Sequence, residues 1–337
     1  MALMIDSTDV RKSNLGLIRK VFWEGGKHTK QTMSKDTGLS VATCNTLLNE
    51  LEASGEITGT KAQLNGIGRS TMVYSLNEEY ESILCVSFDL NSTNSRVLTA
   101  VVLTMLGKQI YRNAKHLDTL TDDDIKDVIK TCISLYPNVS SIMVGTNGVV
   151  DNGILRMTDI PEIEGMHISD AVKEAAVDIP CHITYDCQYR AYGAYISKGY
   201  TKGTLTLFYC LKNVVPGSAS IVNRHVINGR NGFAGMTGYI PFGTDIEHVN
   251  KQIAEGRPEG IAQAIVSIIS TINPDEIVFA GNVIDSSYLE KISAAVKEMI
   301  PEVFIPQFSI AENFGNDYYL EGMYQKAKEL KTNVLNI

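Results

Sequence analysis

The sequence has no long apolar run, no paired cysteines and no excess of basic side chains. No stretch of its 337 residues is apolar enough to span a bilayer, and no basic-then-apolar leader opens it, so we expect a cytoplasmic protein without membrane contact. The six cysteines lack C-x-x-C spacing, which is typical of reduced, mostly buried thiols rather than of a zinc or redox site. The length and a hydrophobic share of 44% favour two or more domains with sizeable cores.

The net charge of −8 is unevenly distributed along the chain. Residues 1–80 hold nine Lys and Arg and nine Asp and Glu, whereas the remaining residues hold 21 and 29 of the totals of 30 and 38. Because an acidic surface repels polyanions, any contact with nucleic acid should be confined to the first 80 residues.

The N-terminal segment begins with two predicted helices. Apolar residues recur at helical spacing over residues 13–22 and stop at a pair of glycines. Thr29 is a suitable N-cap for a second helix over residues 30–37, which Gly38 ends.

A third predicted helix, capped by Ser40, has two different faces. One stripe is expected to be buried: Val41, Cys44, Leu48 and Leu51. The other face carries small and hydrogen-bonding side chains. Two helices joined by a Gly-Leu-Ser turn, the second with such a face, are typical of a helix-turn-helix whose second helix enters the major groove. We therefore predict that a double-stranded DNA operator is contacted by Ser40, Ala42, Thr43, Asn45 and Thr46.

Two strands are predicted next, over residues 56–60 and 71–76. The loop between them contains a glycine-flexible arginine, which is typical of the wing of a winged helix-turn-helix, and we expect Gly68 and Arg69 to contact DNA. The alternative is a small helical packing module whose polar faces are only solvated.

From residue 81 onward, a three-stranded meander followed by alternating helices and strands occurs twice. This repetition indicates an α/β body with two lobes, of the ribonuclease H-like, actin-type ATPase and sugar-kinase-like fold. We expect a winged helix-turn-helix over residues 1–80, a first lobe over 81–200 and a second lobe over 201–337, whose C-terminal helix can return to the first. The second lobe is predicted to contain one long helix over residues 247–272.

Five segments carry a family pattern, in chain order: Gly68-Arg69-Ser70, Met143–Asp151, Ile160–Gly165, Tyr185-Asp186 and Gly229–Tyr239. They are similar to the G-R-P, G-V-P-G-x-V-D, N-L-P-x-W-E-G, Asn-Asp and G-x-x-G-F-A-G-E-I-G-H segments of the ROK family, which comprises repressors and sugar kinases. The order is preserved over nearly the whole chain. The resemblance implies the regulator form of this family, a winged helix-turn-helix followed by a sugar-kinase-like body.

The phosphate turns implied by the resemblance are altered. The family's D-x-G-G-T is Asp89-Leu90-Asn91-Ser92-Thr93 here, and its T-x-G-T-G-I-G-G-G is Cys210–Ser218, where β-branched residues and a proline replace glycines. We therefore expect no ATP, no other cofactor and no catalysis. Asp186 stands at the family's catalytic-base position, although an aspartate at a strand-to-helix junction is equally explained as a helix N-cap.

The metal and sugar contacts implied by the resemblance are altered too. Tyr239 replaces the family's zinc-binding histidine and no cysteine follows Cys210, so we expect no metal site. The cleft between the lobes is expected to be more aromatic than a simple sugar site, with two further tyrosines, Tyr189 and Tyr192. A small effector would be contacted by Asn147, Asp159, Tyr185, Asp186, Met236 and Tyr239. The alternative is that the tyrosines fill the cleft and that no ligand binds.

These patterns favour an effector-responsive transcriptional repressor that binds a two-fold symmetric operator as a homodimer or larger homo-oligomer. Two alternatives stay open. One is a regulator whose body serves only for oligomerisation or a protein contact, and the other is an active carbohydrate kinase with an added DNA-binding segment.

Overall fold

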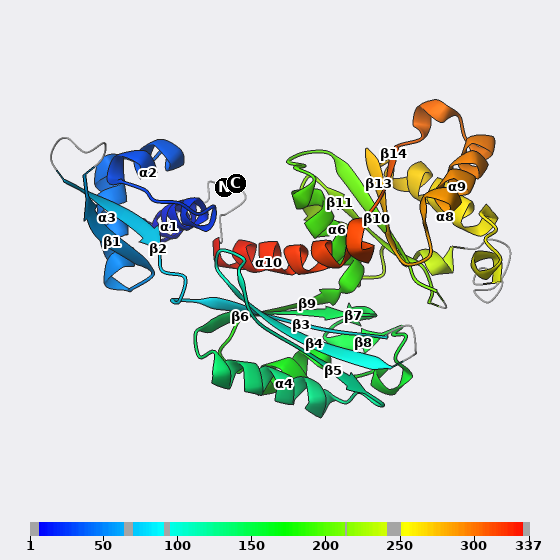
Figure 1. Cartoon of the computed structure of the whole chain (residues 1–337), viewed down its shortest axis with the longest axis horizontal. Coiled ribbons are helices and arrows are strands. Elements are labelled where there is room, and N and C mark those ends of the chain that lie inside the picture. Colours follow the sequence, from blue (N-terminus) through cyan, green and yellow to red (C-terminus); the bar gives the residue numbers. More distant parts are fainter. Residues whose placement is uncertain (1–6, 64–69, 91–94, 213, 241–250, 333–337) are drawn as a thin grey trace, which may run out of the picture.

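The computed structural model describes residues 7–63, 70–90, 95–212, 214–240 and 251–332. An N-terminal module and two lobes surround a long C-terminal helix (Figure 1). None of the helices in the described part of the chain has the length and hydropathy that a membrane span needs.

The N-terminal module, residues 7–76, consists of three helices and a two-stranded antiparallel sheet. Its elements are α1 (Ser7–Trp23), α2 (Lys30–Thr37), α3 (Val41–Ala53), β1 (Ile57–Ala62) and β2 (Thr71–Leu76). Thr29 forms a capping box at the start of α2, Gly38 ends that helix at φ 73°, and the Ser40 side chain accepts a hydrogen bond from the Thr43 amide. These caps confirm the predicted second and third helices, whereas α1 begins earlier than predicted, at Ser7.

The core of the module confirms most of the predicted stripe on α3. Cys44, Leu48 and Leu51 are buried, together with Leu47. The prediction is wrong for Val41, which is 46% exposed. Periodicity places a residue on a helix face, but that residue is buried only where a neighbouring element covers it, and the first residue of α3 is not covered.

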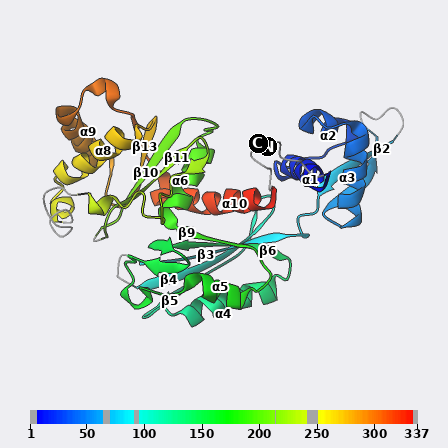
Figure 2. The ribbon, with the colours of Figure 1, turned by 180° about the vertical axis from the view of Figure 1, so that it is seen from behind.

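The first lobe is a five-stranded mixed sheet in the order β5-β4-β3-β6-β9, with β3 antiparallel to β4 and parallel to β6. Two of its helices lie below the sheet when the molecule is seen from behind (Figure 2). Its elements are β3 (Ser82–Leu90), β4 (Arg96–Thr104), β5 (Gln109–Leu117), α4 (Asp122–Leu135), β6 (Val139–Thr146), β7 (Val149–Asp151), β8 (Ile154–Arg156), α5 (Ile168–Ala175) and β9 (Cys181–Tyr185).

The second lobe repeats this topology in the order β12-β11-β10-β13-β14. The repeat confirms the predicted α/β body of two lobes that follows the N-terminal module. The remaining elements are α6 (Asp186–Ser197), β10 (Thr204–Cys210), β11 (Gly217–Val222), β12 (His225–Val226), α8 (Glu259–Ile272), β13 (Glu276–Gly281), α9 (Ser286–Met299), β14 (Gln307–Ile310) and α10 (Asn316–Thr332).

Each sheet is covered on both faces because successive strand residues point to opposite sides. In β3, Leu84 and Val86 pack in the core formed with α4 and α5, whereas Ile83 and Cys85 pack with α10. The second sheet is divided in the same way between α8 with α9 on one face and α6 on the other. The two helices α6 and α10 therefore form the layer between the lobes.

The predicted long helix over residues 247–272 is wrong. Residues 251–254 are helical, but the chain turns at Gly256, which has φ 64°, and α8 begins only after Pro258. Left-handed backbone interrupts a helix, and proline cannot donate the helical hydrogen bond, so a new helix starts behind it. The predicted start of the helix lies outside the described residues.

The helices α6 and α10 touch backbone to backbone. A Cβ built on Gly193 of α6 would lie 1.9 Å from the carbonyl oxygen of Tyr318, and one built on Gly322 of α10 would lie 1.9 Å from that of Tyr189. Glycine is the only residue that allows this separation. The lobes are therefore joined by a crossing in which no side chain can be inserted.

Helix α10 also links the body to the N-terminal module. Trp23 at the end of α1 is buried in the same hydrophobic cluster as Tyr324 of α10. The Tyr324 hydroxyl donates a 3.0 Å hydrogen bond to the carbonyl of Met105, and Lys331 pairs with Glu81 at 2.7 Å. One helix thus contacts the module and both lobes.

Candidate functional site

The outward face of α3 is the first candidate site. Val41, Ala42, Thr46 and Asn49 are exposed and lie on one side of the helix. The predicted contacts Ala42 and Thr46 are therefore accessible. Val41 was not predicted as a DNA contact because its spacing matches the buried stripe. Its side chain adds an apolar group of the kind that contacts a thymine methyl.

The other predicted residues of this helix are held by local hydrogen bonds. The hydroxyls of Ser40 and Thr43 lie 2.8 Å apart, and the Asn45 side chain accepts a hydrogen bond from the Lys30 ammonium group. Both Thr43 and Asn45 are half-buried. Their polar atoms are thus fixed in position at the edge of the exposed face.

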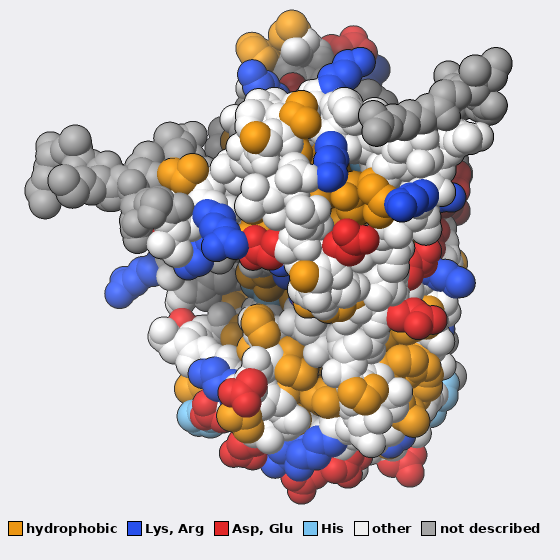
Figure 3. All heavy atoms as spheres, turned by 90° about the vertical axis from the view of Figure 1, so that its left-hand side faces the viewer, with side chains coloured by type: hydrophobic (Ala, Val, Ile, Leu, Met, Phe, Trp, Pro, Cys, Tyr) orange, Lys and Arg blue, Asp and Glu red, His pale blue; other side chains and the backbone are white. Residues whose placement is uncertain are grey.

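Two arginines of the N-terminal module are paired with carboxylates, so part of its positive charge is neutralised. Arg19 makes two hydrogen bonds to Glu56, of 2.7 and 2.8 Å, and Arg11 pairs with Glu50. The exposed cations that remain on this end of the molecule include Lys12, Lys27 and Lys35. Figure 3 shows lysine and arginine side chains at several places on this face. The predicted wing residues Gly68 and Arg69 lie outside the described residues.

A fully buried arginine is the centre of the second candidate site, between the lobes. Arg190 of α6 donates hydrogen bonds from Nε to the Asp186 carboxylate at 3.1 Å and from Nη1 to Asn316 at 3.1 Å. Its guanidinium lies between the rings of Tyr209 and Tyr319, 4.4 and 4.3 Å from their centroids. The charge is therefore satisfied by one carboxylate and by two aromatic faces.

This arrangement corrects the structural explanation of Asp186. The N-cap of α6 is Tyr185, no side chain caps that helix, and the carboxylate of Asp186 is ion-paired with Arg190. Asp186 is only 3% exposed. Burial and the ion pair with Arg190 restrict access to this carboxylate in this conformation, whereas a general base must come within hydrogen-bond reach of the substrate hydroxyl.

Burial and the negative charge of Asp186 raise the pKa of two further aspartates. Burial raises the pKa of Asp89 to about 6, and the charge of Asp186 adds to the shift while Arg190 opposes it. Burial also raises the pKa of Asp159 to about 6, again with a contribution from Asp186. Arg190 thus lies in the field of Asp186 and Asp89, and both Asp89 and Asp159 are costly to ionise.

Replacing Asp89 with Asn should remove a pH-dependent loss of stability. The folded pKa is above the ordinary value, so ionisation of Asp89 disfavours the folded state, and wild-type stability should fall as pH rises from about 4 to about 6. We expect Asp89→Asn to be more stable than the wild type at neutral pH by on the order of 1 kcal/mol, but not at pH about 4. Urea unfolding across this range measures the difference.

The control for this experiment is Asp127→Asn, because Asp127 is exposed on α4. Its unfolding free energy should follow the wild-type pH profile. A wild-type profile parallel to that of Asp89→Asn would show that the Asp89 carboxylate is not destabilised by burial.

The predicted effector residues are only partly brought together. Asp159, Tyr185 and Asp186 interact electrostatically, and Met236 packs against the cluster that contains Tyr185. Asn147 accepts a 2.7 Å hydrogen bond from the Thr158 hydroxyl, next to Asp159. These contacts link five of the six predicted residues.

The backbone amide of Tyr239 donates a 3.1 Å hydrogen bond to the Met236 carbonyl, but its side chain is open to solvent. It is 48% exposed, and its ring centroid is 5.7 Å from that of Phe233. In the same loop Gly235 has φ 94°, and a Cβ on it would lie 2.0 Å from the carbonyl oxygen of Ser218. Backbone geometry therefore accounts for this glycine without any ligand.

Tyr185 fills space beside the altered second phosphate turn. A Cβ on Gly217 would lie 2.1 Å from the Tyr185 hydroxyl, so the ring reaches the backbone of the turn. The altered first turn falls mostly at residues 91–94, outside the described residues.

Three cavities are lined by residues other than the six predicted effector contacts. One of about 650 Å³ lies beside Asp89 and α10, and one of about 620 Å³ lies next to α5. The third, of about 860 Å³, lies between α1 and the body, and Tyr189 and Tyr192 are among the residues that line it. No sequence signal indicated this cavity because its walls come from four distant parts of the chain.

Comparisons with known proteins agree with this architecture. A model of the ROK family matches residues 95–252. The solved structure of a ROK family transcriptional regulator, a homolog of the E. coli MLC protein, is similar over 96% of this chain and 99% of its own, with 16% identity and a TM-score of 0.71. No curated protein sequence matches significantly.

Two further solved structures resemble the body. A ROK family protein from Streptococcus pneumoniae, in complex with sucrose, is similar over 74% of this chain and 99% of its own, with 15% identity and a TM-score of 0.57. A ROK hexokinase from Thermus thermophilus is similar over 74% of this chain and 99% of its own, with 14% identity and a TM-score of 0.56. At these identities the similarity establishes the fold.

Proposed function

Because the chain is a ROK family protein, we propose that it is a DNA-binding transcriptional regulator that acts as a repressor in the cytoplasm. This proposal rests on how much of the chain each structural similarity covers. The similarity to the transcriptional regulator extends over 96% of the chain, whereas the similarity to the hexokinase covers 74%. The exposed face of α3, with Ala42 and Thr46, supplies a surface suited to base edges.

The body is proposed to have lost catalysis. Two observations support this: the carboxylate of Asp186 is buried and paired with Arg190, and the Tyr185 ring occupies the space beside Gly217. The second candidate is a working carbohydrate kinase, which the position of Asp186 after β9 favours. ATP turnover with any member of a sugar panel, lost in Asp186→Asn, would decide for the kinase.

We further propose that the protein binds DNA as a homodimer or larger homo-oligomer and responds to a carbohydrate-related or other small effector between the lobes. The proposed contacts are Asn147, Asp159, Tyr185, Asp186, Met236 and Tyr239. An effector that prefers one arrangement of the lobes shifts the distance between the two α3 helices of a dimer. A tenfold change in operator affinity requires a difference of only about 1.4 kcal/mol.

Selection of genomic DNA fragments with the purified protein tests the function. We expect enrichment of a site with two half-sites about 34 Å apart and a binding constant that falls as salt rises, because phosphate contacts release counterions. The sequences of the enriched fragments show the half-sites and their spacing. Titrations of one such fragment at several salt concentrations measure how the binding constant depends on salt. Absence of enrichment under every condition would contradict a DNA-binding function.

A further inference from the structure

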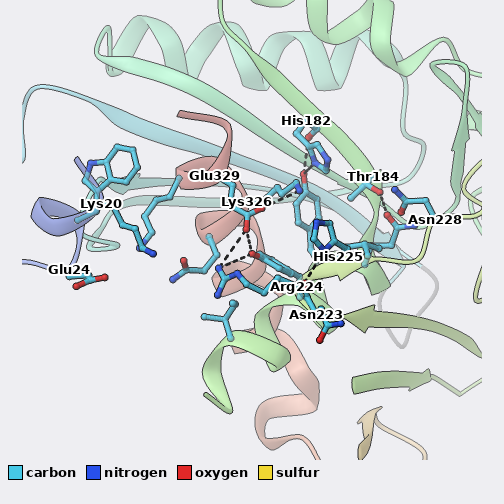
Figure 4. A pocket seen from close by; sticks show the side chains of 18 of the residues that line it. Lys20, Glu24, His182, Thr184, Asn223, Arg224, His225, Asn228, Lys326 and Glu329 are labelled. Atoms are coloured by element: carbon cyan, nitrogen blue, oxygen red, sulfur yellow. Dashed lines mark hydrogen bonds and ion pairs between the residues drawn. The ribbon is translucent and has the colours of Figure 1, made fainter. Parts of the chain in front are cut away.

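A cavity of about 860 Å³ lies where the N-terminal module meets the body (Figure 4). Its walls come from α1, from β9 and α6, from the turn between β11 and β12, and from α10. Small-molecule sites have volumes of roughly 300–1,000 Å³. The cavity is large enough for such a ligand, and it contains none of the residues proposed for the effector between the lobes.

Cationic side chains outnumber acidic ones around this cavity. The acidic residues are Glu24 and Glu329. The basic residues are Lys20, Arg224, Lys326 and Lys328. The residues after position 80 carry 21 Lys and Arg against 29 Asp and Glu, so the cavity reverses the charge balance of the body. A cavity with one predominant sign of charge concentrates small ions of the opposite sign.

The backbone holds one of these cations at a conformational cost. The turn between β11 and β12 consists of Asn223 and Arg224, both with positive φ, 48° and 70°. Such two-residue turns favour glycine at the second position, so an arginine there is strained. Its guanidinium is 3.3 Å from the Tyr192 hydroxyl and 3.6 Å from Glu329. These contacts hold the guanidinium at the cavity wall, and Glu329 also pairs with Lys326 at 3.3 Å, so one carboxylate is shared by two cations.

The remaining wall is suited to an organic ligand with hydroxyl groups. Trp23, Tyr189 and Tyr192 border the cavity but are only 5%, 2% and 2% exposed, whereas the half-buried amide of Gln325 supplies a donor and an acceptor. A few polar groups in a cavity are sufficient to fix the orientation of such a ligand. Figure 4 shows Lys20 of α1 and Lys326 of α10 on different sides of the cavity.

We propose that this cavity binds a small polyhydroxylated anion, with its phosphate or carboxylate group at Arg224 and Lys326 and its hydroxyl groups toward the amide of Gln325. Since α1 forms one wall, the bound anion fixes the N-terminal module relative to α10. In a dimer this changes the placement of the two α3 helices. The effect on DNA rests on the proposed regulatory function, whereas binding of the anion does not.

Fluorescence of Trp23 tests the proposal directly, because it is the only tryptophan in the chain and it lines the cavity. The full chain is titrated with glucose 6-phosphate and with gluconate at constant ionic strength, with glucose as the neutral probe. We expect a saturable change with the two anions and none with glucose. Lys326→Ala should weaken binding about tenfold, because a charge-assisted hydrogen bond is lost.

Two variants keep this test free of folding artefacts. Lys326→Arg retains the charge and should restore most of the affinity, and Lys130→Ala removes an exposed lysine from α4 and should bind like the wild type. A lack of saturable change with both anions would overturn the proposal. So would an equal response to glucose, or unchanged affinity in a folded Lys326→Ala variant.

Operator binding separates this proposal from the regulatory function. Specific DNA binding without any anion binding would reject the cavity proposal alone. Anion binding that is sensitive to Lys326, in a protein that enriches no DNA, would reject the regulatory function and leave the cavity as a ligand site.

Discussion

Ala42→Asp is expected to weaken specific DNA binding about 100-fold, or by ~2.7 kcal/mol, in a protein that remains folded. Ala42 is exposed in the first turn of α3, so the new carboxylate would face the acceptors and phosphates of the groove. In the free protein the same carboxylate is favourable, because the N-terminus of a helix stabilises negative charge. Anisotropy titrations with the enriched operator measure the loss of affinity, and urea unfolding shows whether the variant remains folded.

The matched control is Ser286→Asp, which places the same charge in the exposed first turn of α9, in the second lobe. Its operator affinity should equal that of the wild type, since net charge changes equally in both variants. Wild-type affinity of Ala42→Asp would remove α3 from the DNA-contacting surface. An equal loss in both variants would show that only overall charge matters.

Gly193→Ala is expected to lower the free energy of unfolding by about 3 kcal/mol, the upper range for overpacking. The new methyl would lie 1.9 Å from the carbonyl oxygen of Tyr318, which is backbone and cannot move aside as a side chain can. The helices α6 and α10 must separate, and both lobes pack on this pair. Urea denaturation of the full chain measures the loss.

Gly199→Ala separates this steric effect from backbone strain. Gly199 has φ 78°, and among the described residues no atom beyond its chain neighbours would lie within 4 Å of the new methyl carbon. Only the left-handed conformation is therefore penalised, by about 1 kcal/mol. Because Gly193 and Gly322 meet at one crossing, the loss in the double alanine variant should be smaller than the summed single losses. Equal losses for Gly193→Ala and Gly199→Ala would contradict tight helix packing.

Local signals in the sequence were sufficient for most elements. The capping residues Thr29 and Ser40 placed α2 and α3, and the repeated pattern of strands and helices after residue 81 placed the two lobes, as the structure has them. These signals work because hydrogen bonds of caps and the spacing of apolar residues depend on neighbours within a few positions. The prediction failed at Gly256, where the apolar pattern outweighed a break signal.

The candidate sites depended more on contacts that the sequence does not specify. Asp186 was visible as a site residue, but its pairing with Arg190 and the enclosure of that arginine by Tyr209 and Tyr319 were not. Likewise Tyr189 was expected in the cleft between the lobes and instead lines the cavity next to α1. Residues on one helix point to different sites according to what packs on each of its faces.

The sequence by itself determined the order of the elements, the exposed polar face of α3 and the repeat of two lobes, since these follow from local hydrogen bonding and from periodicity. Only the tertiary structure decided which charges are buried and where cavities form. Lys20 and Lys326 line one cavity although they are far apart in the chain. Such neighbours are set by the packing of α10 against α1 and α6, and packing depends on the shapes of whole surfaces rather than on the spacing of residues along one segment.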